Sequence, residues 1–131
     1  MLKTKSVYSP IDRKNDGLRI HTARTRGRGL SSKQYDVWMP NLGPSQSLKD
    51  LVQGERITWS EFERRYRREL FELGPVDRRC GKHYRNHGQK FTLRLLKELA
   101  QRGRVTLMCT CGEGDLCHIN VLKRVIKSRR I

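Results

Sequence analysis

The chain has 131 residues, enough for about one domain, and hydrophobic residues make up 35% of it. Lys and Arg number 29 against 13 Asp and Glu, so the net charge is +16. No run of about 18 apolar residues occurs, which excludes a membrane-spanning helix. Residues 1–10 lack the apolar stretch of a secretory signal, so we expect a cytoplasmic protein without membrane contact. The charge predicts an anionic partner, nucleic acid or another polyanion.

Two strand candidates lie in the first part of the chain, over residues 2–8 and 18–22. We expect a loop over residues 9–17 between them, because that segment contains Pro and an Asn-Asp-Gly turn signal. The second strand candidate leads directly into a basic, glycine-containing loop over residues 24–29.

Two helices are predicted next. Ser45 has the position of an N-cap for a short helix through Val52 that Gly54 closes. Thr58 and Glu61 have capping-box spacing at the start of a longer helix. Its predicted buried face consists of Trp59, Phe62, Tyr66, Leu70 and Leu73. Its arginines lie mostly off that face, where they are either simply solvated or follow a phosphate backbone.

The C-terminal half begins with an expected break at Gly74-Pro75 and a segment rich in charge and histidine over residues 78–87. A third helix has the apolar face Phe91, Leu95, Leu96 and Leu99. A buried strand over 105–111, a tight loop over 112–115 and a last helix with the face Val121, Leu122, Val125 and Ile126 follow. This order predicts an α/β fold, with residues 1–131 forming a single compact domain in which helices flank a small, mainly parallel sheet.

The basic loop contains Arg24, Arg26 and Arg28, which alternate with small residues. Such spacing allows close backbone approach and several phosphate contacts, and loops beyond the carboxyl ends of strands are where open α/β sheets bind ligands. We therefore predict an anion-binding site there. The alternative is a solvated loop whose charge has no specific role.

Cys117 and His118 fall near the predicted start of the last helix, where the helix dipole favours a thiolate and disfavours an imidazolium. A thiolate beside a neutral imidazole is suited to nucleophilic catalysis, so these two are the candidate catalytic residues. The alternative is structural: Cys109 is a small core residue and His118 caps the helix.

Zinc is the one cofactor that the sequence suggests. Cys80 and His83 have CxxH spacing, and Cys109, Cys111 and Cys117 could complete a tetrahedral site with them. Cys109 and Cys111 are two residues apart, so on a strand their side chains point to the same face. Without an export signal, free thiols or metal ligands are expected in preference to disulfides.

The chain resembles the Domain of Unknown Function 488 (DUF488) family, in particular its short YeaO-like branch, over nearly its whole length. The matching positions are Val7-Tyr8, Asp16-Gly17, Arg19, Arg24, Arg28-Gly29-Leu30, Trp38, Pro44-Ser45, Leu48, Phe62, Tyr66, Leu70 and the VTLM strand with Cys117-His118.

The resemblance implies an α/β fold and adds Arg19 to the anion-binding candidates, and Cys109 and Cys117 match two cysteines of longer members. Where the family has Asp-Arg-Leu-Trp-Pro-Arg-Gly, this chain has residues 23–29 without the acid, tryptophan and proline. Ile119 replaces the arginine that follows Cys-His in longer members. The family implies no established reaction.

Three hypotheses remain open at this point. The charge favours a protein that binds nucleic acid or another phosphate-bearing ligand without chemistry. The Cys117-His118 motif favours a small enzyme that acts on a phosphate-bearing substrate. The clustering of Cys and His favours a zinc-stabilised interaction module. The sequence indicates nothing about the oligomeric state.

Overall fold

The fold is seen in a computed structural model that describes residues 1–77, 84–111, 116–129 and 131. Four strands form one sheet, and two more pair separately as an antiparallel hairpin. The strands of the sheet are β1 (Leu2–Ser6), β2 (Leu18–His21), β3 (Val37–Trp38) and β6 (Val105–Cys109), and those of the hairpin are β4 (Leu73–Asp77) and β5 (Tyr84–His87). The α-helices are α1 (Arg13–Asp16), α2 (Gln46–Gln53), α3 (Trp59–Phe71), α4 (Lys90–Arg102) and α5 (His118–Lys127).

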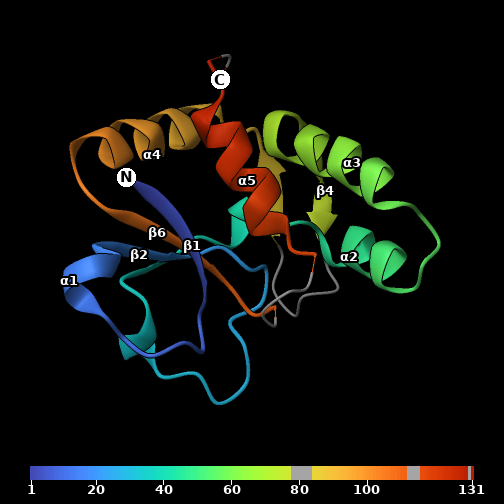
Figure 1. The fold of residues 1–131 in the computed structure, drawn as a ribbon. Coiled ribbons are helices and arrows are strands. Elements are labelled where there is room, and N and C mark those ends of the chain that lie inside the picture. The colour runs from blue at the N-terminus through green and yellow to red at the C-terminus, as the bar shows by residue number, and fades with distance from the viewer. Residues whose placement is uncertain (78–83, 112–115, 130) are drawn as a thin grey trace.

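The sheet is parallel throughout, with the strand order β1-β6-β2-β3 (Figure 1). Leu107 on the central strand β6 lies opposite Thr4 of β1 and Ile20 of β2. Because the strands run in the same direction, the segments that leave β2 and β6 emerge at one edge of the sheet. This confirms the predicted small parallel α/β sheet and places the two candidate functional segments side by side.

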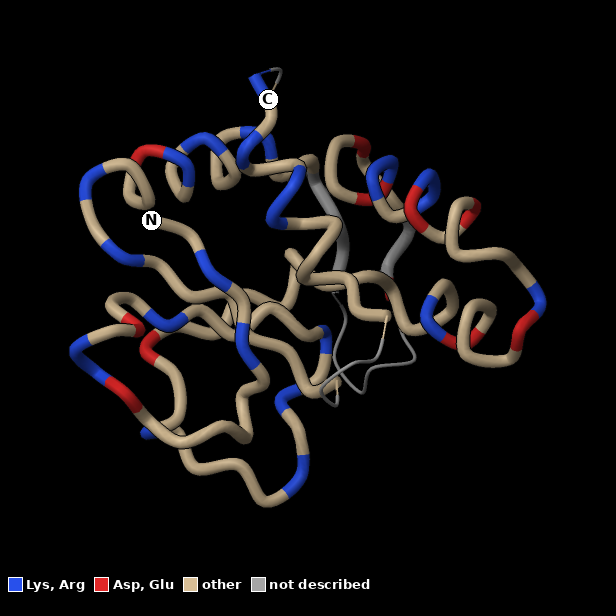
Figure 2. Tube along the Cα trace, viewed as in Figure 1, with Lys and Arg blue, Asp and Glu red and all other residues tan. Residues whose placement is uncertain are grey.

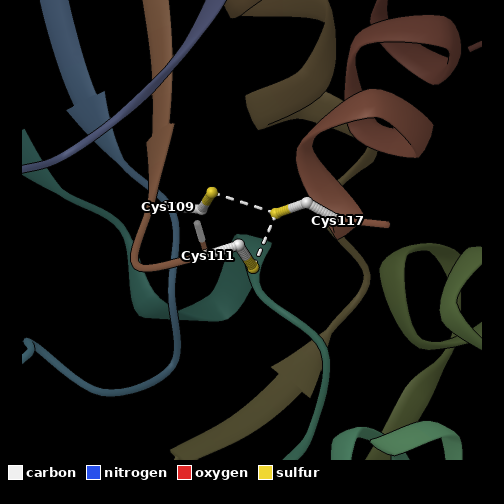
Figure 3. A group of neighbouring side chains, drawn as sticks. All are labelled: Cys109, Cys111 and Cys117. Carbon is white, nitrogen blue, oxygen red and sulfur yellow. Dashed lines mark hydrogen bonds between the residues drawn. The ribbon is translucent and has the colours of Figure 1, made fainter. Parts of the chain in front are cut away.

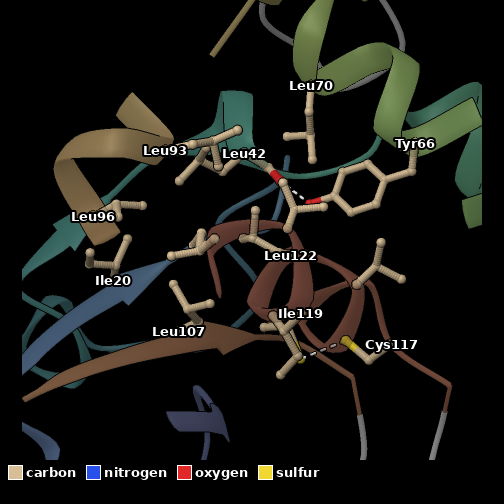
Figure 4. Close-up of a cluster of buried hydrophobic side chains, with 14 of the residues drawn as sticks. Ile20, Leu42, Tyr66, Leu70, Leu93, Leu96, Leu107, Cys117, Ile119 and Leu122 are labelled. Atoms are coloured by element: carbon tan, nitrogen blue, oxygen red, sulfur yellow. Dashed lines mark hydrogen bonds between the residues drawn. The ribbon is translucent and has the colours of Figure 1, made fainter. Parts of the chain in front are cut away.

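The main core lies between the sheet and helices α3, α4 and α5, which cover the same face (Figures 1 and 4). Ile20 and Leu107 from the sheet are fully buried there against Tyr66 of α3, Leu96 of α4 and Leu122 of α5. A smaller cluster on the other face contains Val7, Leu30 and Met108. Within the described residues, no helix is long and apolar enough to cross a membrane.

The predicted face of the third helix is wrong in part. Leu93 and Leu96 are fully buried in α4, whereas Leu95 is 56% exposed and Phe91 is 80% exposed. Leu99, also expected in the core, is 37% exposed. The sequence offers two apolar stripes of helical spacing, and the one that packs against α5 and β6 is the stripe through positions 93 and 96.

Other boundaries also differ from the predictions. The expected loop over 9–17 contains α1, and a strand, β4, occupies the expected break at Gly74-Pro75. The expected loop over 112–115 lies outside the described residues. The caps at Ser45 and Thr58 are confirmed, because each side chain accepts a hydrogen bond from a backbone amide of its helix. Gly17 has φ of 62°, and a Cβ there would overlap the Arg104 carbonyl, so this turn requires glycine.

Candidate metal centre

Three cysteines meet where β6 ends and α5 begins (Figure 3). Cys109 is the last residue of β6, and its side chain lies in the main core together with that of Leu107. Cys111 follows two residues later, and Cys117 is the N-cap residue of α5. The parallel strand and the following helix thus bring together thiols from both ends of one connecting segment.

The sulfur atoms lie close together. The Sγ of Cys117 is 2.9 Å from that of Cys109 and 2.9 Å from that of Cys111, and all three lie within 4.8 Å of one another. In a tetrahedral zinc–thiolate site the sulfurs are about 3.8 Å apart, because each Zn–S bond is about 2.3 Å long. The cluster could therefore hold a metal ion after small side-chain adjustments.

The thiols differ in acidity. The pKa of Cys111 is lowered well below its usual value, because hydrogen bonds with Cys109 and then Cys117 favour its thiolate. Hydrogen bonding with Cys111 and Cys117, together with burial, raises the pKa of Cys109. The pKa of Cys117 rises to about 12: the hydrogen bond with Cys109 opposes the rise, while Cys111 and burial cause it. Cys111 is therefore the thiol of the three whose ionised form is favoured.

His118 lies against the cluster. Its Nδ1 is 3.8 Å from the Sγ of Cys117, and its Nε2 is 3.1 Å from the Oγ1 of Thr22, just beyond β2. The ring is buried and makes an edge-on contact with the Tyr66 ring, with centroids 5.8 Å apart. The candidate catalytic pair Cys117 and His118 is thus inside the protein, and Thr22 and Tyr66 are neighbours that the sequence did not suggest.

A groove of about 460 Å³ opens next to the cluster. Cys111 lines it together with Lys49, Trp59, Thr110 and Leu116. Cys109 and Cys117 are buried in the main core, whereas Cys111 is half-buried and reaches the groove. Cys111 is therefore the thiol of the cluster that a molecule in the groove would meet.

The arginines selected from the sequence lie in different surroundings. Arg19 is buried, and its guanidinium is 3.1 Å from a carboxylate oxygen of Asp36. Arg24 is buried, donates to the Gly43 carbonyl and lies 3.6 Å from a carboxylate oxygen of Asp77. Each of these two guanidinium groups thus already has a carboxylate of the same chain beside it, a buried one for Arg24 and an exposed one for Arg19.

The other two arginines of this group, Arg26 and Arg28, are exposed. Arg26 donates to the Tyr35 hydroxyl, and the Arg28 carbonyl accepts from Tyr8. The segment that carries them does leave the same sheet edge as the cysteine segment, because β2 pairs with β6 in parallel.

Asp77 and Glu69 have roles that the sequence did not reveal. Asp77 accepts a hydrogen bond from the backbone amide of Gln46, and Glu69 accepts from the backbone and the hydroxyl of Ser45. Both carboxylates thus lie at the N-terminus of α2, where the helix dipole favours negative charge. Their contacts are long-range, so no local spacing could have indicated them.

The fold and the cluster define a small parallel α/β protein with a thiol group that could hold a metal ion. A family model described as "Active DUF488-N3 subclade" matches residues 2–130, so the chain belongs to the DUF488 family. This confirms the family resemblance, while the narrower placement in the YeaO-like branch stays a prediction. No curated protein and no solved structure matches the chain. Cys80 and His83, the other two predicted metal ligands, lie outside the described residues.

Proposed function

We propose that this protein is a zinc-stabilised binding module in which Cys109, Cys111 and Cys117 hold one Zn²⁺. The observation that carries the proposal is the convergence of the three sulfur atoms within 4.8 Å. Thiolates are soft ligands, and a compact set of them favours zinc among the common divalent ions of cells. The free thiols also suit a reducing compartment, and the cytoplasm is the location we propose.

The ion would tie the central strand to the last helix. Cys109 ends β6 and Cys117 is the N-cap residue of α5, so a metal bound by both would fix the angle at which the helix leaves the sheet edge. A chain of 131 residues has a core of modest size, and a structural metal adds its binding free energy to folding.

The test is metal content together with stability. Protein purified without chelator should carry about one equivalent of zinc, and removal of the zinc should lower the melting temperature. Cys111→Ser should lose the metal, while Cys80→Ser is the control that asks whether a fourth cysteine takes part. Protein that carries no metal, and that chelators leave unchanged, would contradict the proposal.

The accessible thiol of Cys111 in the groove would then favour the alternative of a small enzyme that acts on phosphate-bearing substrates.

Nucleic acid is the partner we propose for this module. The supporting observation is the net charge of +16, which is spread over most helices and loops (Figure 2). On α3 the charge is largely paired, since Glu61 binds Arg64 and Arg65, and Glu63 binds Arg124 of α5. Arg67 of α3 is exposed as well, and the exposed charge outside α3 includes Arg28, Lys127 and Arg129. A dispersed charge favours contacts with the phosphate backbone of a nucleic acid, and such contacts have little sequence preference.

A binding titration tests this partner. We expect the protein to bind DNA or RNA at low salt, with an affinity that falls steeply as salt rises, because each phosphate contact releases counterions. Several unrelated sequences of equal length should bind within a few-fold of one another. Absence of binding to both polymers at low salt would remove nucleic acid as the partner and leave the zinc proposal standing.

A further inference from the structure

Thr22 determines which nitrogen of His118 carries the proton. The Thr22 hydroxyl has a single proton, and it donates this proton to the Met108 carbonyl at 2.8 Å. The same oxygen lies 3.1 Å from the Nε2 of His118, and it can only accept there. The Nε2 of a neutral His118 therefore carries the hydrogen, and its Nδ1 has a free lone pair.

That lone pair lies near the thiol of Cys117. The Nδ1 of His118 is 3.8 Å from the Sγ of Cys117. Zn–S bonds of about 2.3 Å and Zn–N bonds of about 2.0–2.1 Å at a tetrahedral angle place nitrogen and sulfur about 3.6 Å apart. The observed separation of 3.8 Å is close to that expected for two ligands of one ion.

The ring is also held in place as a ligand requires. His118 is 6% exposed, and the edge-on contact with Tyr66 restricts its rotation. The Tyr66 hydroxyl is itself fixed by a hydrogen bond to the Leu42 carbonyl. Histidine ligands of metals almost always donate their second ring nitrogen to a protein acceptor, and Thr22 supplies that acceptor here.

We propose that His118 is the fourth ligand of the metal centre, through Nδ1, and that Thr22 is the residue that orients it. This inference rests on the proposed zinc centre. A Cys₃His set fills the four tetrahedral positions, so no position is left for a reactive water and the ion is structural. It also gives His118 a role other than that of a general base for Cys117.

X-ray absorption at the zinc edge tests the ligand set on the full chain. The wild-type protein should show three sulfurs at about 2.3 Å and one nitrogen at about 2.0–2.1 Å. His118→Ala should lose the nitrogen and bind zinc at least about tenfold more weakly, while His118→Cys should restore tight binding with four sulfurs. His83→Ala and Cys80→Ser are the matched controls, and both should keep the three-sulfur, one-nitrogen set.

Thr22→Val provides a second test, because it keeps the shape of the side chain and removes its hydroxyl. Zinc affinity should fall about 10- to 100-fold with the same ligand set, whereas Thr4→Val on β1 should change nothing. If His118→Ala does not fold, the ligand set is decided by the wild-type and His118→Cys spectra, which should show a nitrogen ligand replaced by a fourth sulfur.

A nitrogen that disappears in His83→Ala would overturn the inference. So would a fourth sulfur that disappears in Cys80→Ser, or an oxygen ligand that survives in His118→Ala. In these three cases the zinc centre itself stands. Protein without any metal would overturn both proposals together.

Discussion

The candidate site residues are arranged differently in the two segments that leave the carboxyl edge of the sheet. After β6, three thiols lie within 4.8 Å of one another next to a groove, and an imidazole nitrogen lies 3.8 Å from one of them. After β2, the arginines separate: Arg24 is buried against Asp77, while Arg26 and Arg28 are exposed. Both segments start at neighbouring parallel strands, so their position in the fold does not explain the difference.

The difference lies in what burial costs each group. Cys109 and Cys117 can enter the core as neutral thiols and become charged only when a metal arrives, so they can share one place with the half-buried Cys111. A guanidinium is always charged, and it enters the core only with a carboxylate beside it. The cysteine segment can therefore converge, whereas each buried arginine must have its own acid.

The largest expected change in stability comes from removal of the acid beside Arg24. Asp77→Ala leaves a buried guanidinium without its carboxylate, and the free energy of unfolding should fall by about 3–5 kcal/mol. Replacement of both partners, Arg24→Met with Asp77→Leu, should recover much of that loss. Asp36→Ala is a milder control, because the Asp36 side chain is 41% exposed. Denaturant unfolding measures all of these, and a loss below about 1 kcal/mol for Asp77→Ala would contradict the comparison.

The next largest expected effect is on the pH dependence of stability, and it comes from the buried carboxylate of Asp16. Burial alone would raise the pKa of Asp16, but hydrogen bonds from Lys3, Lys5 and the Asp12 amide lower it from 3.8 to about 2. The folded state thus favours the ionised form, which contributes about 2 kcal/mol above pH 4, and this contribution is lost as the pH falls from about 4 toward 2. Asp16→Asn should flatten stability over that interval, and equal slopes for both proteins would count against the pairing.

The sequence predicted most helices and strands because their signals are local. Thr58 and Glu61 specify the start of α3, and the apolar run after residue 104 identifies the central strand. The buried face of α4 could not be predicted in the same way. Phe91 and Leu95 have helical spacing as good as that of Leu93 and Leu96, and only the position of α5 selects between the two stripes.

The site was predictable to a similar degree. The spacing of Cys109 and Cys111 suggested a shared face, and their meeting with Cys117 follows from the strand and the helix that flank the segment. Thr22 was not predictable, because it is 96 residues away from His118 and carries no motif. The pairing of Arg24 with Asp77 was missed for the same reason, since an isolated acid has no local signature.

The reactivity of the three thiols tests the arrangement of the cysteine segment after β6. In metal-free Cys80→Ser protein, iodoacetamide should modify Cys111 at least about tenfold faster than Cys109 or Cys117, because its pKa is lowered and it reaches the groove. Peptide mapping by mass spectrometry measures the three rates. Added zinc should protect all three thiols. Equal rates would mean that the cluster opens as a unit and that Cys111 is not distinct.

The smallest expected effect concerns the exposed part of the arginine loop. Arg28 leaves the sheet edge beside the cysteine segment, whereas Arg129 is an exposed residue beyond the last helix. If the loop organises an anion site, Arg28→Ala should weaken binding of a short phosphorylated ligand several-fold, and Arg129→Ala should leave it nearly unchanged. On long DNA or RNA each variant should lose at most about one unit from the slope of log affinity against log salt, since each removes at most one phosphate contact. Equal losses on the short ligand would mean that only general basicity attracts anions. Arg28 would then differ from Arg24 only in lying outside the core, and the convergence at this edge of the sheet would belong to the cysteines alone.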